Sequence, residues 1–280
     1  MTRPVVAHNP AELSWPPEPG KASVARRAPE SEHADPVGSV GSVDRDGPGV
    51  GVGVGVGGGA VSALELYDEA LAAHLTGLPP VHLLARPAGG LPVALALHRW
   101  CAPAEPADRA ALDRLRAALP AQARVLDLGC GPGRHSAYLH GAGLAVLGAD
   151  TSAAAVALTR RSGVPALHAD ALGRLPGRGT WDGVLLLDGN VGIGGNPRRL
   201  LIQAAGLLTP GGRVLVELDP DSVSDCRWLQ LGSGERVSGP FPWARLAAGA
   251  GLGRAAAGSG LVVNCYWSQH GRRFALLSPG

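Results

Sequence analysis

The stretch VLDLGCGPGRH, residues 125–135, decides the fold of this chain. It begins as a short apolar strand, passes through closely spaced glycines and leads into a helix. Glycines in such a loop let the backbone turn tightly and let a ligand approach its N–H groups. Gly129, Gly131 and Gly133, with Cys130 between the first two, therefore predict a nucleotide-binding loop.

The spacing of the glycines favours one class of nucleotide over another. The dinucleotide fingerprint G-x-G-x-x-G would require a glycine where the chain has Arg134. Asp127 lies just before the first glycine, and its carboxylate would repel a pyrophosphate. A carboxylate suits a ligand that carries an ammonium and a sulfonium group. The loop thus argues against NAD and favours S-adenosylmethionine.

On both sides of this loop the chain alternates between apolar strands and helices. Strands are expected at 123–129, 144–150, 165–170, 181–188 and 213–219. Repeated βα units of this kind predict an α/β fold, with a parallel sheet covered by helices on both faces.

Carboxylates fall where these strands end. Asp150 comes about 20 residues after the glycine loop, a spacing that suits hydrogen bonds to ribose hydroxyls. The alternative is that Asp150 caps the next helix, where Thr151 or Ser152 would serve equally. Asp170 and Asp188 follow the third and fourth strands, and a set of such residues is difficult to explain as surface solvation.

These motifs resemble the class I (Rossmann-like) S-adenosylmethionine-dependent methyltransferases, whose first motif is similar to DLGCGPG at 127–133. The resemblance is closest to actinomycete enzymes that act on small molecules. It covers 123–219 well and 62–277 more loosely. It implies a doubly wound, mainly parallel sheet of seven strands in the order 3-2-1-4-5-7-6, with the last strand antiparallel.

The resemblance also implies roles for single residues. Asp170 would accept a hydrogen bond from the adenine amino group, the N–H of Ala171 would donate to the ring, and the backbone near Asp188 would hold the methionine amino group. The cofactor-binding set is then Asp127, Gly129, Cys130, Gly131, Gly133, Asp150, Thr151, Asp170, Ala171, Asp188 and Gly189.

The catalytic residues are less clearly marked. Methyl transfer is an in-line displacement that positioning alone can accelerate, so an acid or base is not required for every acceptor. His135 and Asp188 are candidates for a general base because of their location. The alternative for His135 is a helix residue at the rim of the loop.

The parts outside the motifs predict the domain organisation. Residues 1–60 are rich in Pro, Gly and Ser and are expected to be disordered. Residues 61–107 are expected to form a helical cap that begins with a capping box of Ser62 and Glu65. The methyltransferase domain would occupy 108–280.

Four further elements are expected within that domain. Asp108 is the predicted N-cap of its first helix. Hairpins are expected at 226–239 and 261–277, and a helix near Pro242.

Composition excludes several function classes. The net charge of +2 gives no basic stripe for a nucleic acid, and no apolar run is long enough for a membrane span. The four cysteines are too far apart for a metal site, and a cytoplasmic location is expected. We interpret the chain as an enzyme that methylates a small molecule, with the acceptor, the methylated atom and the oligomeric state left open. The alternatives are a catalytically silent methyltransferase-like binding subunit and an NAD-type oxidoreductase.

Overall fold

The computed structural model describes residues 61–220 and 223–280 of the protein. The predicted disorder of 1–60 falls outside the described residues. None of the helices in the described ranges is long and apolar enough to cross a membrane.

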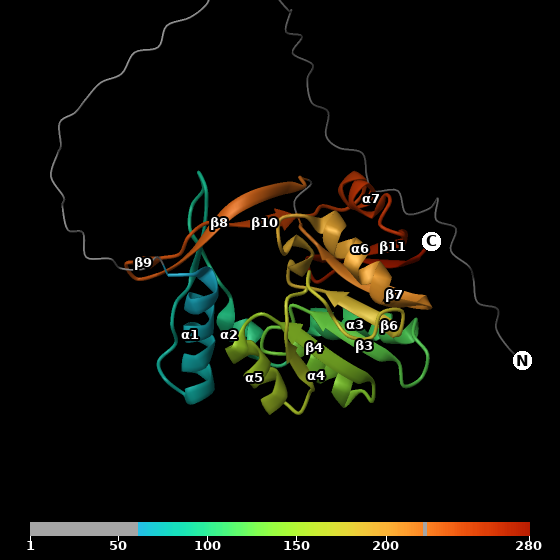
Figure 1. Ribbon diagram of the computed structural model, residues 1–280, viewed down its shortest axis with the longest axis horizontal. Coiled ribbons are helices and arrows are strands. Elements are labelled where there is room, and N and C mark those ends of the chain that lie inside the picture. Colours follow the sequence, from blue (N-terminus) through green and yellow to red (C-terminus); the bar gives the residue numbers. More distant parts are fainter. Residues whose placement is uncertain (1–60, 221–222) are drawn as a thin grey trace, which may run out of the picture. The chain divides into compact units, whose positions relative to one another are not determined.

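A seven-stranded sheet forms the centre of the fold (Figure 1). Its strands are β3 (Arg124–Leu128), β4 (Ala145–Asp150), β5 (Ala166–His168), β6 (Trp181–Leu186), β7 (Leu208–Leu218), β11 (Leu261–Gln269) and β12 (Arg272–Pro279). They lie in the order β11-β12-β7-β6-β3-β4-β5. β3 to β7 are parallel, and β12 is antiparallel to both of its neighbours. This order is 3-2-1-4-5-7-6 in the predicted numbering, and the expected topology is confirmed.

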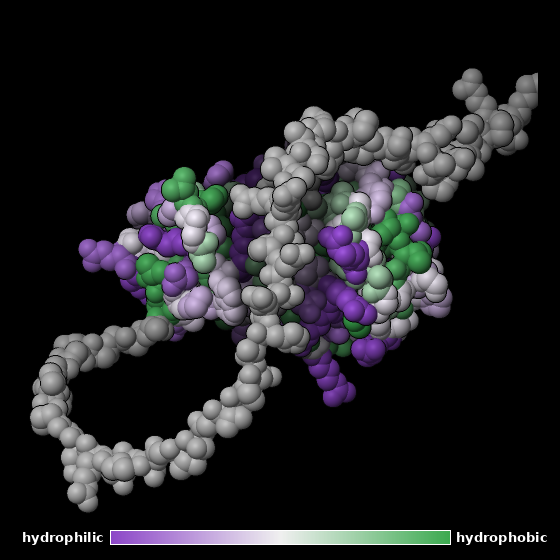
Figure 2. Space-filling model, turned by 90° about the horizontal axis from the view of Figure 1, so that it is seen from above, coloured by the Kyte–Doolittle hydropathy of each residue, from purple (hydrophilic) through white to green (hydrophobic). Residues whose placement is uncertain are grey.

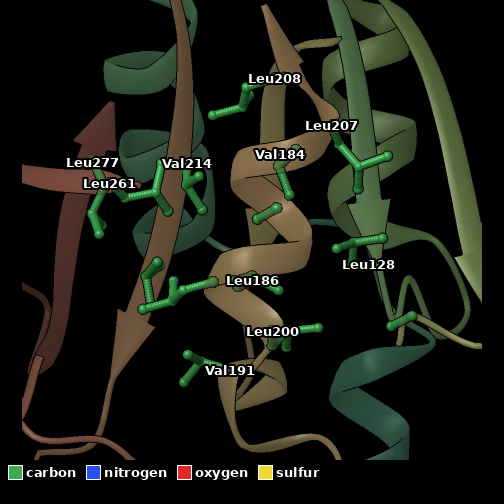
Figure 3. Close-up of a cluster of buried hydrophobic side chains, with 14 of the residues drawn as sticks. Leu128, Val184, Leu186, Val191, Leu200, Leu207, Leu208, Val214, Leu261 and Leu277 are labelled. Atoms are coloured by element: carbon green, nitrogen blue, oxygen red, sulfur yellow. The ribbon is translucent and has the colours of Figure 1, made fainter. Parts of the chain in front are cut away.

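Helices cover both faces of this sheet because its central strands are apolar on both sides. In β6 and just after it, Val184 and Leu186 face one buried cluster while Leu185 and Leu187 face the other. α6 (Pro197–Leu207) and α7 (Ala250–Ala256) contribute to the first cluster. α3 (Pro106–Ala117) and α4 (Arg134–Gly141) contribute to the second. Figure 3 shows part of the first cluster, with Leu200 of α6 close to the strand residues.

A second sheet lies beyond the carboxyl ends of the parallel strands. It has the order β10-β8-β1-β2, formed by β10 (Phe241–Arg245), β8 (Asp225–Ser233), β1 (Leu84–Pro87) and β2 (Val93–Ala94), and β9 (Arg236–Val237) pairs with β8. In Figure 1 this sheet and α1 (Ala63–Thr76) lie to one side of the seven-stranded sheet. Figure 2 shows hydrophobic residues in small groups among hydrophilic ones on the visible surface.

Two predictions about these segments need correction. The segment 61–107 contains α1 and the short helix α2 (Leu97–Trp100), but it also supplies β1 and β2, so it is not purely helical. The helix expected near Pro242 is the strand β10, since Phe241–Arg245 pairs antiparallel with β8. Proline is tolerated there because β10 lies at the edge of its sheet.

Of the two N-caps predicted from the sequence for α1 and α3, the first is confirmed and the second is wrong. Ser62 and Glu65 form the predicted capping box, with the Glu65 N–H donating to Ser62 Oγ at 3.0 Å and the Ser62 N–H donating to Glu65 Oε2 at 2.6 Å. The N-cap of α3 is Glu105 rather than Asp108. Asp108 lies one turn further on and accepts from the Glu105 N–H at 2.8 Å. Both predicted hairpins form, as β8–β9 and β11–β12.

Candidate active site

A cavity of about 410 Å³ opens where β3, β4 and β6 end. Its volume lies in the range of small-molecule sites. Among the predicted cofactor residues, eight line it: Gly129, Cys130, Gly131, Asp150, Thr151, Asp170, Ala171 and Asp188. Asp127, Gly133 and Gly189 do not.

The glycine loop is held in a shape that only glycine fits at two lining positions. Gly129 and Gly131 have φ of +71° and +52°. A Cβ at Gly129 would lie 2.8 Å from Nδ2 of Asn190, which donates to the carbonyls of Leu128 at 3.0 Å and of Gly129 itself at 2.7 Å. A Cβ at Gly131 would lie 3.4 Å from the Tyr67 hydroxyl. The loop therefore leaves an open cradle that side chains would fill.

The remaining loop residues support this cradle from behind. Gly133 precedes α4 with φ of +87°, and a Cβ there would lie within 3.0 Å of three Thr159 atoms. Cys130 is buried, and burial raises the pKa of its thiol well above the ordinary value. A thiol that stays protonated is a poor nucleophile, so Cys130 lines the cavity without offering covalent chemistry.

Asp150 joins the end of β4 to the glycine loop. Its Oδ2 accepts from the Gly131 N–H and its Oδ1 from the Ser152 N–H, each at 2.8 Å. Burial raises the pKa of Asp150, and these backbone donors offset only part of that rise. Each oxygen still has a lone pair for a hydroxyl donor. The N-cap of α5 (Ala153–Arg161) is Ser152, whose Oγ accepts from the Ala155 N–H at 2.9 Å, so capping does not account for Asp150.

Asp127 lies beneath the loop rather than in the cavity. It is 1% exposed and accepts from Ser136 Oγ at 2.6 Å, and burial raises the pKa of its carboxyl. Its contact with Ser136 ties β3 to α4, and the sequence argument that it faces the ligand directly is not supported by this geometry.

The rim of the cavity carries the remaining predicted residues. Asp170 is exposed and accepts from the Leu172 N–H at 2.8 Å, which turns the chain after β5. Ala171 is buried and Thr151 is exposed. Gly189 has φ of +79° and follows Asp188, which itself has φ of +53°, so the chain turns sharply where β6 ends.

Asp188 is tied into a network of arginines. Both of its oxygens accept from Arg134 Nη2 at 2.6 Å, and Oδ1 also lies 3.3 Å from Arg272 Nη2. Its backbone N–H donates to Glu217 Oε2 at 2.7 Å. Burial alone would raise the pKa of Asp188, but the nearby His135 and Arg134 lower it by more. Asp188 is therefore held as a carboxylate and is a weak base.

Asp108 is the buried centre of the same network. Its carboxylate accepts from Arg134 and Arg272, and Oδ1 lies 3.3 Å from Nε2 of His135. Burial would raise the pKa of Asp108, but the hydrogen bonds from His135 and Arg272 hold it well below the ordinary value. The two guanidinium groups are thus neutralised largely inside the protein.

Sequence reasoning missed several residues of this site. Tyr67 and Asn190 line the cavity but had no role assigned from the sequence, whereas Trp100 and Trp243, which also line it, had been considered both for an acceptor pocket and as core anchors. Arg134 was noticed only as a departure from the dinucleotide fingerprint. Its position directly after the last glycine was the available signal, because a charged side chain there must either face the ligand or find a buried partner.

Comparison with known proteins identifies the family. A family model described as a methyltransferase domain matches residues 101–265, more than half of the chain. The chain belongs to this methyltransferase domain family. The family and enzyme class predicted from the glycine loop are confirmed. No curated protein matches this methyltransferase.

Solved structures support the same fold. The methyltransferase is 21% identical to an S-adenosylmethionine-dependent methyltransferase from Bacteroides fragilis in complex with S-adenosyl-L-homocysteine, with a TM-score of 0.65 over 79% of this chain and 98% of that chain. CalS10 of Micromonospora echinaspora, an amino pentose methyltransferase, is 21% identical, with a TM-score of 0.51 over 66% of this chain and 95% of that chain. CcbJ of Streptomyces caelestis is 19% identical, with a TM-score of 0.50 over 65% of this chain and 92% of that chain.

Proposed function

We propose that the protein transfers a methyl group from S-adenosylmethionine to a small-molecule acceptor. The observation that carries this proposal is the pairing of an open glycine cradle with the Asp150 carboxylate, which retains acceptor capacity toward the cavity. Membership of the methyltransferase domain family supports it.

The residues present fit this cofactor. The space over Gly131, below the Tyr67 hydroxyl, is one that a Cβ would enter and a ligand can use. Asp150 would accept from both ribose hydroxyls, while Asp170 and the Ala171 N–H would meet the adenine edge. The cavity end near Asp188 and Asn190 would take the methionine portion.

When bound, S-adenosylmethionine supplies a methyl group activated on a sulfonium. The chain then has to orient the acceptor and exclude water. Tyr67 and Trp100, in edge contact with ring centroids 6.3 Å apart, would close the cavity on one side. Asp188 is not proposed as the base, because Arg134 occupies both of its oxygens. The cytoplasmic location remains a prediction from composition.

Titration calorimetry with the full chain tests the cofactor. S-adenosylhomocysteine is expected to bind with a dissociation constant on the order of micromolar, and NAD at least about tenfold more weakly, a gap of about 1.4 kcal/mol. Preferential binding of NAD would overturn the proposal. Transfer of a labelled methyl group into the low-molecular-mass fraction of a cell extract then tests turnover, and a protein that binds but never transfers would be the silent subunit.

A further inference from the structure

The cavity has two chemically different walls. The ionisable residues that line it, among them Arg134, His135 and Asp150, come from the seven-stranded sheet and the segments that follow its strands. The opposite wall, called the roof here, comes from α1, α2 and the second sheet, and includes Leu95, Trp100, Leu229, Leu231, Phe241 and Trp243. Within the described residues, no charged side chain lines the cavity from the roof.

We propose that the roof binds an uncharged, planar aromatic acceptor that carries a hydroxyl group, and that Nδ1 of His135 takes the hydroxyl proton. This inference rests on the proposed function, because the charged wall must be the part that holds the cofactor.

The aromatic residues of the roof favour a planar acceptor. Tyr67 and Trp100 meet edge to face at 75°, and Phe241 and Trp243 do so at 88° with centroids 6.5 Å apart. Such rings offer faces and edges on which another ring can stack. A cationic amine placed against this wall would lose water without gaining a carboxylate, because Asp188 is already bound by Arg134.

The geometry of His135 identifies the atom that would accept the proton. His135 lines the cavity, is 5% exposed, and its Nε2 lies 3.3 Å from Asp108 Oδ1. An ionised carboxylate can only accept, so Nε2 carries a hydrogen, and whenever the ring is neutral its lone pair is on Nδ1. Nδ1 makes no hydrogen bond to any residue that the structure describes. Asp108 is thus a positioning residue for the ring.

The other charged groups around His135 leave this assignment in place. Arg134 and Arg272 bind Asp108, and Arg99 lies 3.9 Å from it. Asp188 Oδ2 lies 3.9 Å from Nε2 and so also favours a hydrogen on that nitrogen. Buried Asp127 lies beneath the loop.

The resulting step is balanced. The acceptor O–H bond breaks and its proton goes to Nδ1. The oxygen lone pair forms a bond to the methyl carbon, and the carbon–sulfur bond breaks with its electron pair moving to sulfur. The products are a methyl ether, a neutral thioether and a protonated His135, which returns its proton to solvent.

The experiment uses 4-nitrophenol as the probe, because its phenolate absorbs visible light and the phenol does not. The full chain is saturated with S-adenosylhomocysteine at a pH where the free probe is protonated. The wild type is expected to bind the probe and to show the phenolate band. His135→Gln, whose amide can still donate to Asp108, should bind the probe with similar affinity but without the band. Asp108→Asn should weaken the band while the probe still binds.

Roof variants test the binding wall. Phe241→Ser, and Leu95→Ser as an independent variant, should weaken probe binding at least about tenfold, roughly 1.4 kcal/mol, with unchanged affinity for S-adenosylhomocysteine. The matched control is Trp228→Ser, since Trp228 is on the strand paired with β10 but is 56% exposed and does not line the cavity. It should behave as the wild type.

Several outcomes would overturn the inference. They are a phenolate band that persists in His135→Gln, absence of probe binding to protein that does bind S-adenosylhomocysteine, or binding of glucosamine where the probe fails. Failure to bind S-adenosylhomocysteine at all would instead overturn the proposed function, and the inference with it.

Discussion

The backbone N–H of Gly131 donates to Oδ2 of Asp150 at 2.8 Å, so the middle of the glycine loop is tied to the end of the neighbouring strand. The second oxygen of Asp150 holds Ser152, the N-cap of α5, through the Ser152 N–H. One carboxylate thereby fixes the relative positions of two ligand-facing segments while keeping lone pairs for a ligand.

Replacing Asp150 should therefore weaken cofactor binding more than folding. Hydrogen bonds to a charged group contribute about 1.5–3 kcal/mol each, so Asp150→Ala should lower affinity for S-adenosylhomocysteine roughly tenfold to several hundredfold. Asp150→Asn keeps one acceptor oxygen, so its affinity should lie between those of the wild type and Asp150→Ala. Calorimetry measures these affinities. Asn196→Ala is the control, because losing the N-cap of α6, which accepts from the Arg199 N–H at 3.1 Å, should cost about 1 kcal/mol of stability with affinity nearly intact. Unchanged affinity in Asp150→Ala would contradict the ribose assignment.

Asp108 should give stability a defined pH dependence. Its pKa is lowered in the folded protein, so its contribution is present above the unfolded pKa of about 3.9 and is lost as the pH falls below that value. Asp108→Asn leaves buried arginines short of a counter-charge and should cost about 3–5 kcal/mol at neutral pH. Urea unfolding should show that the difference in free energy of unfolding between the wild type and Asp108→Asn becomes smaller below about pH 4.

The control for this pH series lies on the same helix. Asp113 pairs with Arg116 at the surface, so Asp113→Asn should cost less than about 1 kcal/mol at any pH. If the difference in free energy of unfolding between the wild type and Asp108→Asn became larger in acid, the lowered pKa of Asp108 in the folded protein would be contradicted.

Asp68 should control how firmly α1 closes over the loop. Its Oδ1 accepts from Ser152 Oγ and, at 3.1 Å, from the Ala154 N–H at the start of α5. A carboxylate at a helix N-terminus contributes about 0.3–2 kcal/mol, so Asp68→Asn should lower the free energy of unfolding by about that amount. Since Tyr67 directly precedes Asp68 and lines the cavity, cofactor affinity should fall as well.

Glu69→Gln is the matched control for Asp68→Asn. Glu69 makes an exposed ion pair with Arg236 at 2.6 Å, which is worth about 0–1 kcal/mol. Calorimetry and thermal unfolding of both variants measure the two effects. Equal affinity losses in the two variants would mean that Asp68 has no specific role.

A chain beginning at Val61 should bind S-adenosylhomocysteine as the full chain does. This start retains the Ser62 cap of α1 and the Val61 carbonyl, which accepts from the Gly239 N–H at 3.4 Å. The composition of 1–60 is rich in Pro, Gly and Ser, so its removal is not expected to weaken cofactor binding. Calorimetry on both chains tests this, and a shortened chain that loses affinity would move the domain boundary.

The sequence predicted what local pattern and a familiar motif can specify. The strand ends, the glycine loop and Asp150 follow from residues close together in the chain, and the sheet order follows from the family resemblance. The hairpin of the second sheet was predicted, but its pairing with 84–87 was not, because Leu84 pairs with Gly232 across a long stretch of chain and the segment around Leu84 has no strong strand pattern of its own. Pro242 was misinterpreted as a helix start because proline is common at both helix starts and edge strands.

The charged network was missed for a different reason. Asp108 has the sequence position of an N-cap, and the abundance of arginine suggested genome composition. Only the packing of α3 against α4 and β12 brings Asp108, Arg134 and Arg272 together. Asp108, which contacts His135, is thus bound by arginines from two other elements, α4 and β12.

The second sheet has a consequence for the order in which the molecule assembles. Its strands come from segments on both sides of β3 to β7, and the Arg236–Glu69 pair joins residues 167 positions apart. Pairings between such distant segments form slowly, so the strands that carry the glycine loop can associate first. The same sheet should be a separate cooperative unit that opens before the rest of the folded protein does.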